Sequence, residues 1–201
     1  MKPVTDYISS KIYANGRGWI FSASDFVENF NIASIEKSLS LLTRKQTIRR
    51  IYRGLYYYPR FSKMLDIELS PDIDQIAAAL ARKFNWRIEP SGETSLNLLG
   101  LSTQIPGRYV YLSDGPNKQF SFGKIAIEFK KAALKDIGFK YKESRLIVAA
   151  LKSLGKEHVN DEIIEKIRMK TDSKMNQKII KDTKTTTGWI YEAIKKIYRM
   201  D

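Results

Sequence analysis

The hydrophobic pattern changes its period once in the N-terminal part of the chain, and this change constrains the fold most. Residues 33–45 carry apolar side chains at the i, i+4 and i+7 positions of a helix, which are Ile35, Leu39 and Leu42. Two β-prone stretches follow directly, 48–52 and 55–58, and Arg53-Gly54 joins them. The sequence therefore predicts a helix followed by a β-hairpin.

Two shorter helices are expected before this pair. Apolar spacing predicts one over 6–14, and a serine cap, Ser22 or Ser24, begins another that ends near residue 30. Three helices followed by a basic hairpin are the elements of a winged helix-turn-helix. In that fold the third helix enters the major groove of DNA and the hairpin touches the adjacent backbone.

Eight residues are the candidates for DNA binding. The face of the third helix that lies opposite its apolar residues, together with the hairpin, carries Ser34, Lys37, Ser40, Arg44, Lys45, Arg49, Arg50 and Arg53. The hairpin cations are expected to neutralise phosphates on any sequence, whereas the short side chains of the helix let it approach base edges. The alternative interpretation is a solvated basic surface with no partner.

Charge divides the chain into three parts. The 35 Lys and Arg against 22 Asp and Glu give a net charge of +13, which favours nucleic acid or an acidic protein as a partner. Residues 1–64 carry net +7, residues 65–123 net −2 and residues 124–201 net +8. With Pro71 nearby, this shift makes 62–70 the expected linker between a DNA-binding domain, 1–62, and a second domain, 70–201.

The second domain is expected to be mixed, which makes the chain α+β with a helical C-terminal part. A helix from residue 73 and a short helix over 92–100 accompany strands within 86–130, and helices follow between 143 and 199. The individual predictions are strands over 86–89, 108–112 and 119–129 and helices over 143–154, 159–169, 175–184 and 187–198.

Composition excludes several kinds of site. The chain has no Cys and one His, His158, so it has no disulfide, no thiolate nucleophile and no multi-histidine metal centre. The N-terminus lacks an apolar signal core and no apolar run approaches the ~20 residues of a membrane span. We therefore expect a soluble, cytoplasmic protein without metal or cofactor.

An enzyme is the less favoured class. Gly92-Glu93-Thr94-Ser95 is similar to the opening motif of nucleotidyltransferases, which also need paired acidic metal ligands on a nearby strand. The predicted strands offer only Glu128. Gly92 is instead expected at a tight turn and Glu93 in a first helical turn, as are the acidic pairs Asp72/Asp74 and Asp161/Glu162. His158 is expected to be a capping or surface residue.

Several segments resemble the AbiEi-type abortive-infection antitoxins. These are the stretches 20–26, 48–59, 89–102 and 109–116, together with the Leu39-x-x-Leu42 helix. The resemblance implies an N-terminal winged helix that represses its own operon at inverted repeats, and a C-terminal domain that counteracts a neighbouring nucleotidyltransferase toxin. The family's usual Gly between the third helix and the wing is absent, so a non-Gly residue among 44–47 is expected to adopt a left-handed conformation.

One alternative to the antitoxin function stays open. The chain would then be a winged-helix repressor whose second domain senses a small molecule. A pocket of polar groups between the strands at 108–129 and the helices would support it.

Overall fold

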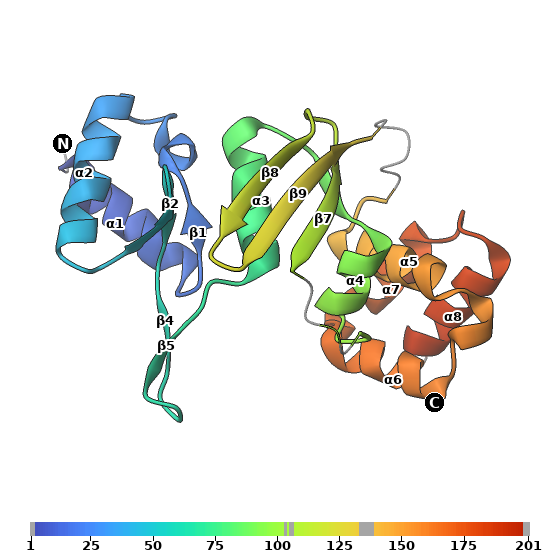
Figure 1. The fold of residues 1–201 in the computed structure, drawn as a ribbon. Coiled ribbons are helices and arrows are strands. Elements are labelled where there is room, and N and C mark those ends of the chain that lie inside the picture. The colour runs from blue at the N-terminus through green and yellow to red at the C-terminus, as the bar shows by residue number, and fades with distance from the viewer. Residues whose placement is uncertain (1–2, 103, 105–106, 133–138, 199–201) are drawn as a thin grey trace. The chain divides into compact units, whose positions relative to one another are not determined.

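The structure is a computed structural model that describes residues 3–102, 104, 107–132 and 139–198. The chain divides into two compact units, the first ending at Trp86 and the second beginning at Arg87 (Figure 1). Helices and strands occur in both units, so the predicted α+β class is confirmed. None of the described helices combines the length and apolarity needed to cross a bilayer.

The boundary between the units differs from the predicted one. The expected linker forms a hairpin of β4 (Arg60–Ser62) and β5 (Ile67–Leu69), and α3 (Ile73–Phe84) joins the first unit. Arg82 of α3 is the reason, because its Nε lies 2.9 Å from Asp25 Oδ1 and its Nη2 donates to the Ile20 carbonyl at 2.7 Å. Such long-range contacts leave no trace in local composition.

The first unit contains a small sheet packed against helices. Its elements are α1 (Val4–Asn15), β1 (Ile20–Phe21), η1 (Ala23–Phe26), α2 (Ile32–Arg44), β2 (Arg49–Tyr52) and β3 (Leu55–Tyr57). The strands are antiparallel in the order β1-β3-β2. The three α2 residues predicted to face a core are buried, against Ile8, Ile12 and the aromatic side chains of Phe21 and Phe26.

The predicted second helix is shorter than expected. A reciprocal capping box between Ser22 and Asp25 begins it, but only a 3-10 turn follows. η1 ends at Phe26, and residues 27–30 form turns up to Asn31, which has an extended backbone and caps α2, accepting the Ser34 N–H at 2.9 Å.

The second unit combines a four-stranded sheet with a helical bundle. Its strands are β6 (Ile88–Pro90), β7 (Arg108–Ser113), β8 (Lys118–Phe122) and β9 (Ile125–Lys131). The order is β6-β7-β9-β8, and only the β7–β9 pair is parallel. The helices are α4 (Gly92–Leu98), α5 (Lys142–Leu154), η3 (Lys156–His158), α6 (Asp161–Lys170), η4 (Ser173–Met175), α7 (Asn176–Asp182) and α8 (Gly188–Tyr198).

Each helix predicted in the second half of the chain is present, within a few residues of its expected ends. The outer bound of 199 given to the helical part lies outside the described residues. The bundle buries an aliphatic core to which α5, α6, α7 and α8 all contribute, including Ile147, Leu151, Ile167, Ile179 and Ile194.

Candidate nucleic-acid interface

Helix α2 carries four of the eight predicted DNA-binding residues. Lys37, Ser40 and Arg44 are exposed and lie on the side of the helix away from its buried residues. Lys45, the C-cap, is exposed beside them. Ser34 is half-buried, and its carbonyl accepts the hydroxyl of the buried Ser38 at 3.0 Å. The face is thus polar and basic, with Ser34 at its edge.

A left-handed residue sets the direction in which the chain leaves α2. The Thr47 N–H donates to the Leu42 carbonyl and the Gln46 N–H to the Thr43 carbonyl, both at 3.0 Å, which is a Schellman motif. Gln46 has φ +58°. The predicted left-handed non-Gly residue is therefore confirmed, at a cost of about 1 kcal/mol.

The structure does not bring the three hairpin arginines together. Consecutive strand residues point to opposite faces, so Arg49 and Arg50 are separated by the sheet. Arg50 is exposed. Arg49 is half-buried, with Nη2 3.1 Å from Glu68 Oε2 and Nη1 donating to the Gln46 carbonyl at 2.6 Å. No local pattern indicated Glu68 as a partner of Arg49, because Glu68 lies in the stretch expected to be a linker.

Arg53 lies in the β2–β3 turn, and its side chain is exposed. Its carbonyl accepts Lys83 Nζ at 3.1 Å, and a Cβ built on Gly54 would lie 2.8 Å from the same nitrogen. Lys83 comes from α3, so the turn gathers cations from two elements. Sequence reasoning missed Lys83 because it assigned α3 to the other domain.

A second basic group near this surface has a structural role. Arg17 donates from Nη1 to the Pro59 carbonyl at 2.9 Å, and its guanidinium lies 4.9 Å from the centroid of the Tyr58 ring. A cleft of about 290 Å³ lies beside it, between the end of α1, the turn after α2 and the β4–β5 hairpin. Arg49 and Glu68 line this cleft together with Arg17.

The residues weighed for catalysis have structural places. Gly92 is the first residue of α4, and a Cβ there would lie 2.6 Å from the Ser153 Cβ of α5. Close helix packing, and not the predicted tight turn, therefore explains this glycine. Glu93 lies in the first turn of α4 as predicted, and Glu128 pairs with Arg108 at 3.2 Å.

The other acidic candidates begin helices, as predicted. Asp72 caps α3 and Asp74 lies in its first turn, while Asp161 and Glu162 occupy the first turn of α6. His158 is exposed, with Nδ1 2.9 Å from the Leu154 carbonyl. In the part of the chain that the structure describes, no three His, Cys, Asp or Glu side chains form a metal site.

The second unit contains a larger cavity, of about 410 Å³, between β6, the start of α4 and α5. Glu89 and Arg145 line it, with Arg145 Nε 3.7 Å from Glu89 Oε1. Lys152 and Ser91 add further polar groups, and Phe139 contributes an aromatic ring. Both signs of charge therefore border one cavity of a size that holds small ligands.

One family model matches the chain, over residues 7–180, and its description is "family of unknown function (DUF6088)". The match spans both units. No curated protein sequence matches the chain.

Proposed function

We propose that this chain, which belongs to the DUF6088 family of unknown function, is a regulator that binds duplex DNA through a winged helix-turn-helix in its first unit. The observation that carries the proposal is the exposed face of α2, where Lys37 and Arg44, beside the exposed Ser40, have no ion-pair partner among the described carboxylates. The element order and the β1-β3-β2 sheet support it, because they match the helix-strand-helix-helix-hairpin plan of such domains.

The two groups of cations have different expected roles. Lys37 and Arg44, with Ser40, select among sequences from the α2 face, whereas Arg50 and Arg53 of the hairpin add affinity on every sequence. Arg49 is expected to add less DNA affinity than Arg50 or Arg53, because Glu68 already neutralises its charge.

Fluorescence anisotropy of the full chain against duplexes from its own upstream region tests this proposal. Neutralising about 4–6 phosphates predicts a log–log salt slope of roughly −4 to −5. Binding that is independent of salt, or no binding to any fragment, contradicts DNA binding. Equal losses on specific and random DNA for Lys37→Ala and Arg53→Ala contradict the division of roles.

The second unit is proposed to act as an antitoxin against a neighbouring nucleotidyltransferase. Two of the segments that carry the antitoxin resemblance, 89–102 and 109–116, adjoin in space. The Val110 N–H donates to Thr94 Oγ1 at 2.8 Å, and Glu89 is paired with Leu112 across β6 and β7. The two segments that carry the resemblance therefore pack together as one motif in the structure.

Co-expression with the neighbouring toxin tests this role in the full chain. The Lys37→Ala/Arg44→Ala variant is expected to rescue growth although its DNA binding is weakened. Cell death with this variant, at an expression level where the unchanged chain rescues, ties protection to transcriptional repression and contradicts a direct antitoxin role.

The cavity beside Arg145 favours a second candidate, a repressor that senses a small molecule. Arg145 and Lys152 provide donors for a carboxylate or phosphate, while Glu89 provides an acceptor. Thermal-shift assays with small carboxylates and phosphates test it. A stabilisation that Arg145→Ala abolishes, coupled to altered DNA affinity, supports sensing, and no shift with any of these probes contradicts it.

A further inference from the structure

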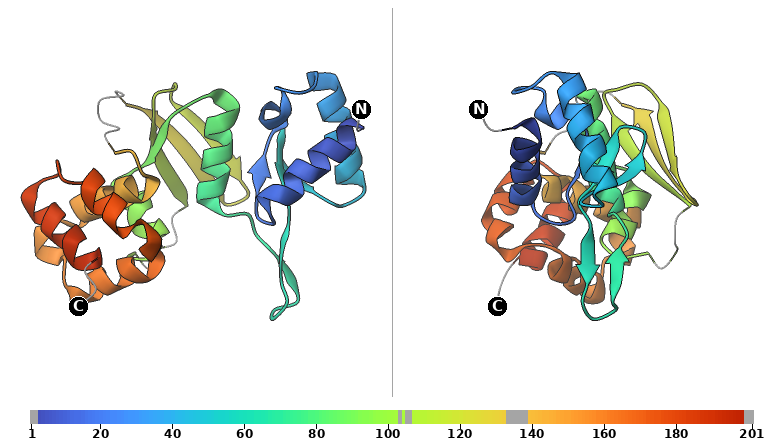
Figure 2. Two further views of the ribbon diagram at one scale, coloured as in Figure 1. Left: turned by 180° about the vertical axis from the view of Figure 1, so that it is seen from behind. Right: turned by 90° about the vertical axis from the view of Figure 1, so that its left-hand side faces the viewer.

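The β4–β5 hairpin leaves the first unit as a two-stranded ribbon (Figures 1 and 2), which we call the arm. Four of its large apolar side chains are more than half exposed, at 53% for Phe61, 89% for Met64, 58% for Leu65 and 51% for Ile67. An isolated two-stranded hairpin is at best marginally stable in water, and apolar clusters on a surface mark interaction sites. We propose that the arm binds the arm of a second copy of this chain.

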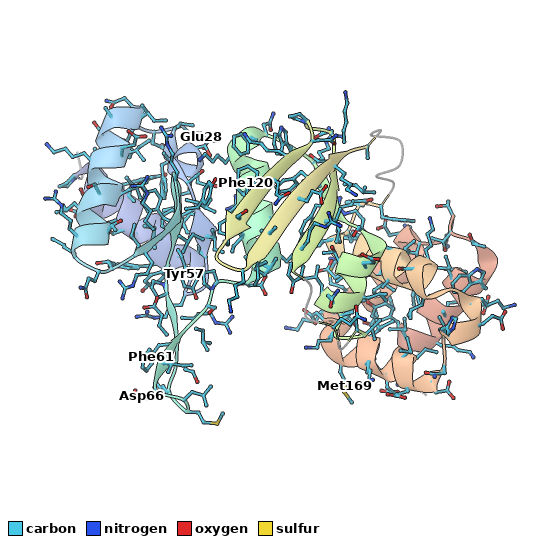
Figure 3. All side chains as sticks on the ribbon, viewed as in Figure 1. Glu28, Tyr57, Phe61, Asp66, Phe120 and Met169 are labelled. Carbon is cyan, nitrogen blue, oxygen red and sulfur yellow. The ribbon has the colours of Figure 1, made fainter. Side chains whose placement is uncertain are left out.

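The two faces of the arm have different surroundings, because Phe61 and Glu68 line the cleft beside Arg17 and Arg49. Residues directly opposite in an antiparallel pair share a face, and the register pairs Phe61 with Glu68 and Ser62 with Ile67. Phe61 and Ile67 therefore lie on opposite faces. Figure 3 shows Phe61 and Asp66 along the arm beyond Tyr57 at its base. Ile67 lies on the face turned away from this cleft and is half exposed, so its burial requires a partner from outside the first unit.

The base of the arm is held in place. Tyr57 Oη accepts the Arg60 N–H at 3.1 Å and donates to the Leu69 carbonyl at 3.0 Å, which joins the two strands to β3. The Arg49–Glu68 ion pair adds a second link. A surface ordered before binding loses less conformational entropy in the complex.

Charge favours a second copy over an acidic partner. The arm carries two cations, Arg60 and Lys63, and two anions, Asp66 and Glu68, within a chain of net charge +13. Nucleic acids and acidic proteins are attracted to excess positive charge, which the arm lacks. Two copies repel each other at their basic surfaces, so contact costs less at this neutral, apolar site than at the α2 face.

The tip is also self-complementary. In a two-fold contact, when one residue of the first copy contacts a different residue of the second copy, the same two residues also make the reverse contact. Lys63 of one arm then faces Asp66 of the other, twice. This pairing depends on the arm alone, so it stands or fails independently of DNA binding.

Sedimentation velocity of the full chain, without DNA and over a wide range of concentrations, tests the pairing. A reversible monomer–dimer equilibrium is expected. Met64→Ser/Leu65→Ser should weaken it about tenfold or more, because apolar area at the contact is lost. Met169→Ser is the matched control, since Met169 is 82% exposed on α6, and it should leave the equilibrium unchanged.

Crosslinking gives a second measurement, because the chain has no Cys. A short bismaleimide should join Leu65→Cys chains to dimers far more than Met169→Cys chains. A monomer at every concentration, a dimer unaffected by Met64→Ser/Leu65→Ser, or equal crosslinking at both positions overturns the proposal. So does a double variant that keeps its dimer but loses DNA affinity, which would assign the arm to DNA.

Discussion

The two basic parts of the chain use their charge differently. In the second unit, cations of α6 and α8 pair with acids on the same helix, as Lys166 does with Glu162, Arg168 with Glu165 and Lys195 with Glu192. On α2, Lys37 and Arg44 pair with no described carboxylate. Net charge alone therefore does not identify a binding surface. Whether a cation is free to bind a partner depends on whether an acidic residue lies three or four positions away from it on the same helix.

Helical spacing explains the contrast. A Glu three or four residues before a Lys or Arg lies on the same stripe of a helix. The hydrogen bond and charge of Lys166 accordingly hold the pKa of the Glu162 carboxyl below its usual range. The only acid on α2 is Glu36, and the position four residues on is Ser40, not a cation. The positive charge of the α2 face is thus not neutralised within the helix.

The largest expected effect concerns whether the first basic part acts by itself. A fragment of residues 1–86 should unfold cooperatively and bind duplex DNA, whereas 1–62 should not fold stably. The shorter fragment loses β5 and the Arg82 contacts to Asp25 and Ile20. Circular dichroism melts of both fragments measure this. A 1–62 fragment that melts as cooperatively as 1–86 would support the domain boundary predicted at residues 62–70.

Removing unpaired and paired cations compares the two parts directly. Lys37→Ala/Arg44→Ala should lower DNA affinity about tenfold or more and flatten the salt slope by up to about 2. Lys166→Ala/Lys195→Ala removes the same charge from paired positions and should change affinity little. Anisotropy titrations at several salt concentrations check both variants. Equal losses would show that only net charge counts.

In the second unit, a carboxylate from a distant helix caps α5, whose own N-cap residue makes no side-chain cap hydrogen bond. Asp182 of α7 accepts the N–H groups of Lys140 and Tyr141, each at 3.1 Å, at the start of α5. Burial alone raises the pKa of Asp182, but these hydrogen bonds, the Ser144 hydroxyl and Arg145 outweigh it, so the pKa lies below its usual range.

The sign of the pH effect follows from this lowered pKa. The stabilisation by the Asp182 carboxylate is present above the pKa of Asp in the unfolded chain. It is lost as the pH falls through the pKa of Asp182 in the folded chain. Asp182→Asn should therefore cost about 1 kcal/mol at neutral pH and progressively less in acid. Urea unfolding at several pH values measures the difference. A constant difference across pH would contradict the capping role.

The smallest expected effect concerns the turn that orients β2 beyond the α2 face. Gln46→Gly should raise the free energy of unfolding by up to about 1 kcal/mol, because Gly adopts φ +58° without strain. Thermal unfolding measures this gain, and Lys45→Gly, where φ is negative, is the matched control and should destabilise. A destabilised Gln46→Gly chain would show that the left-handed turn carries little strain.

Local signals account for what sequence reasoning predicted. The apolar spacing in 33–45 and 143–198 and the acidic residues Asp72 and Asp161 at helix starts act within one or two helical turns. The helices of the second half, the β2–β3 hairpin and the exposed face of α2 were therefore accessible from residue order. The same holds for the left-handed turn after α2, because the absence of Gly there was visible.

Contacts between distant residues decided the rest. Residue order does not show that Asp182 caps α5, that Glu68 neutralises Arg49, or that Arg82 joins α3 to the first unit. Nor does it show that a polar stretch around Pro71, typical of a linker, lies next to a paired hairpin with exposed apolar side chains. Periodicity and capping depend on neighbours along the chain, whereas these ion pairs and hydrogen bonds form only after folding brings separate elements together.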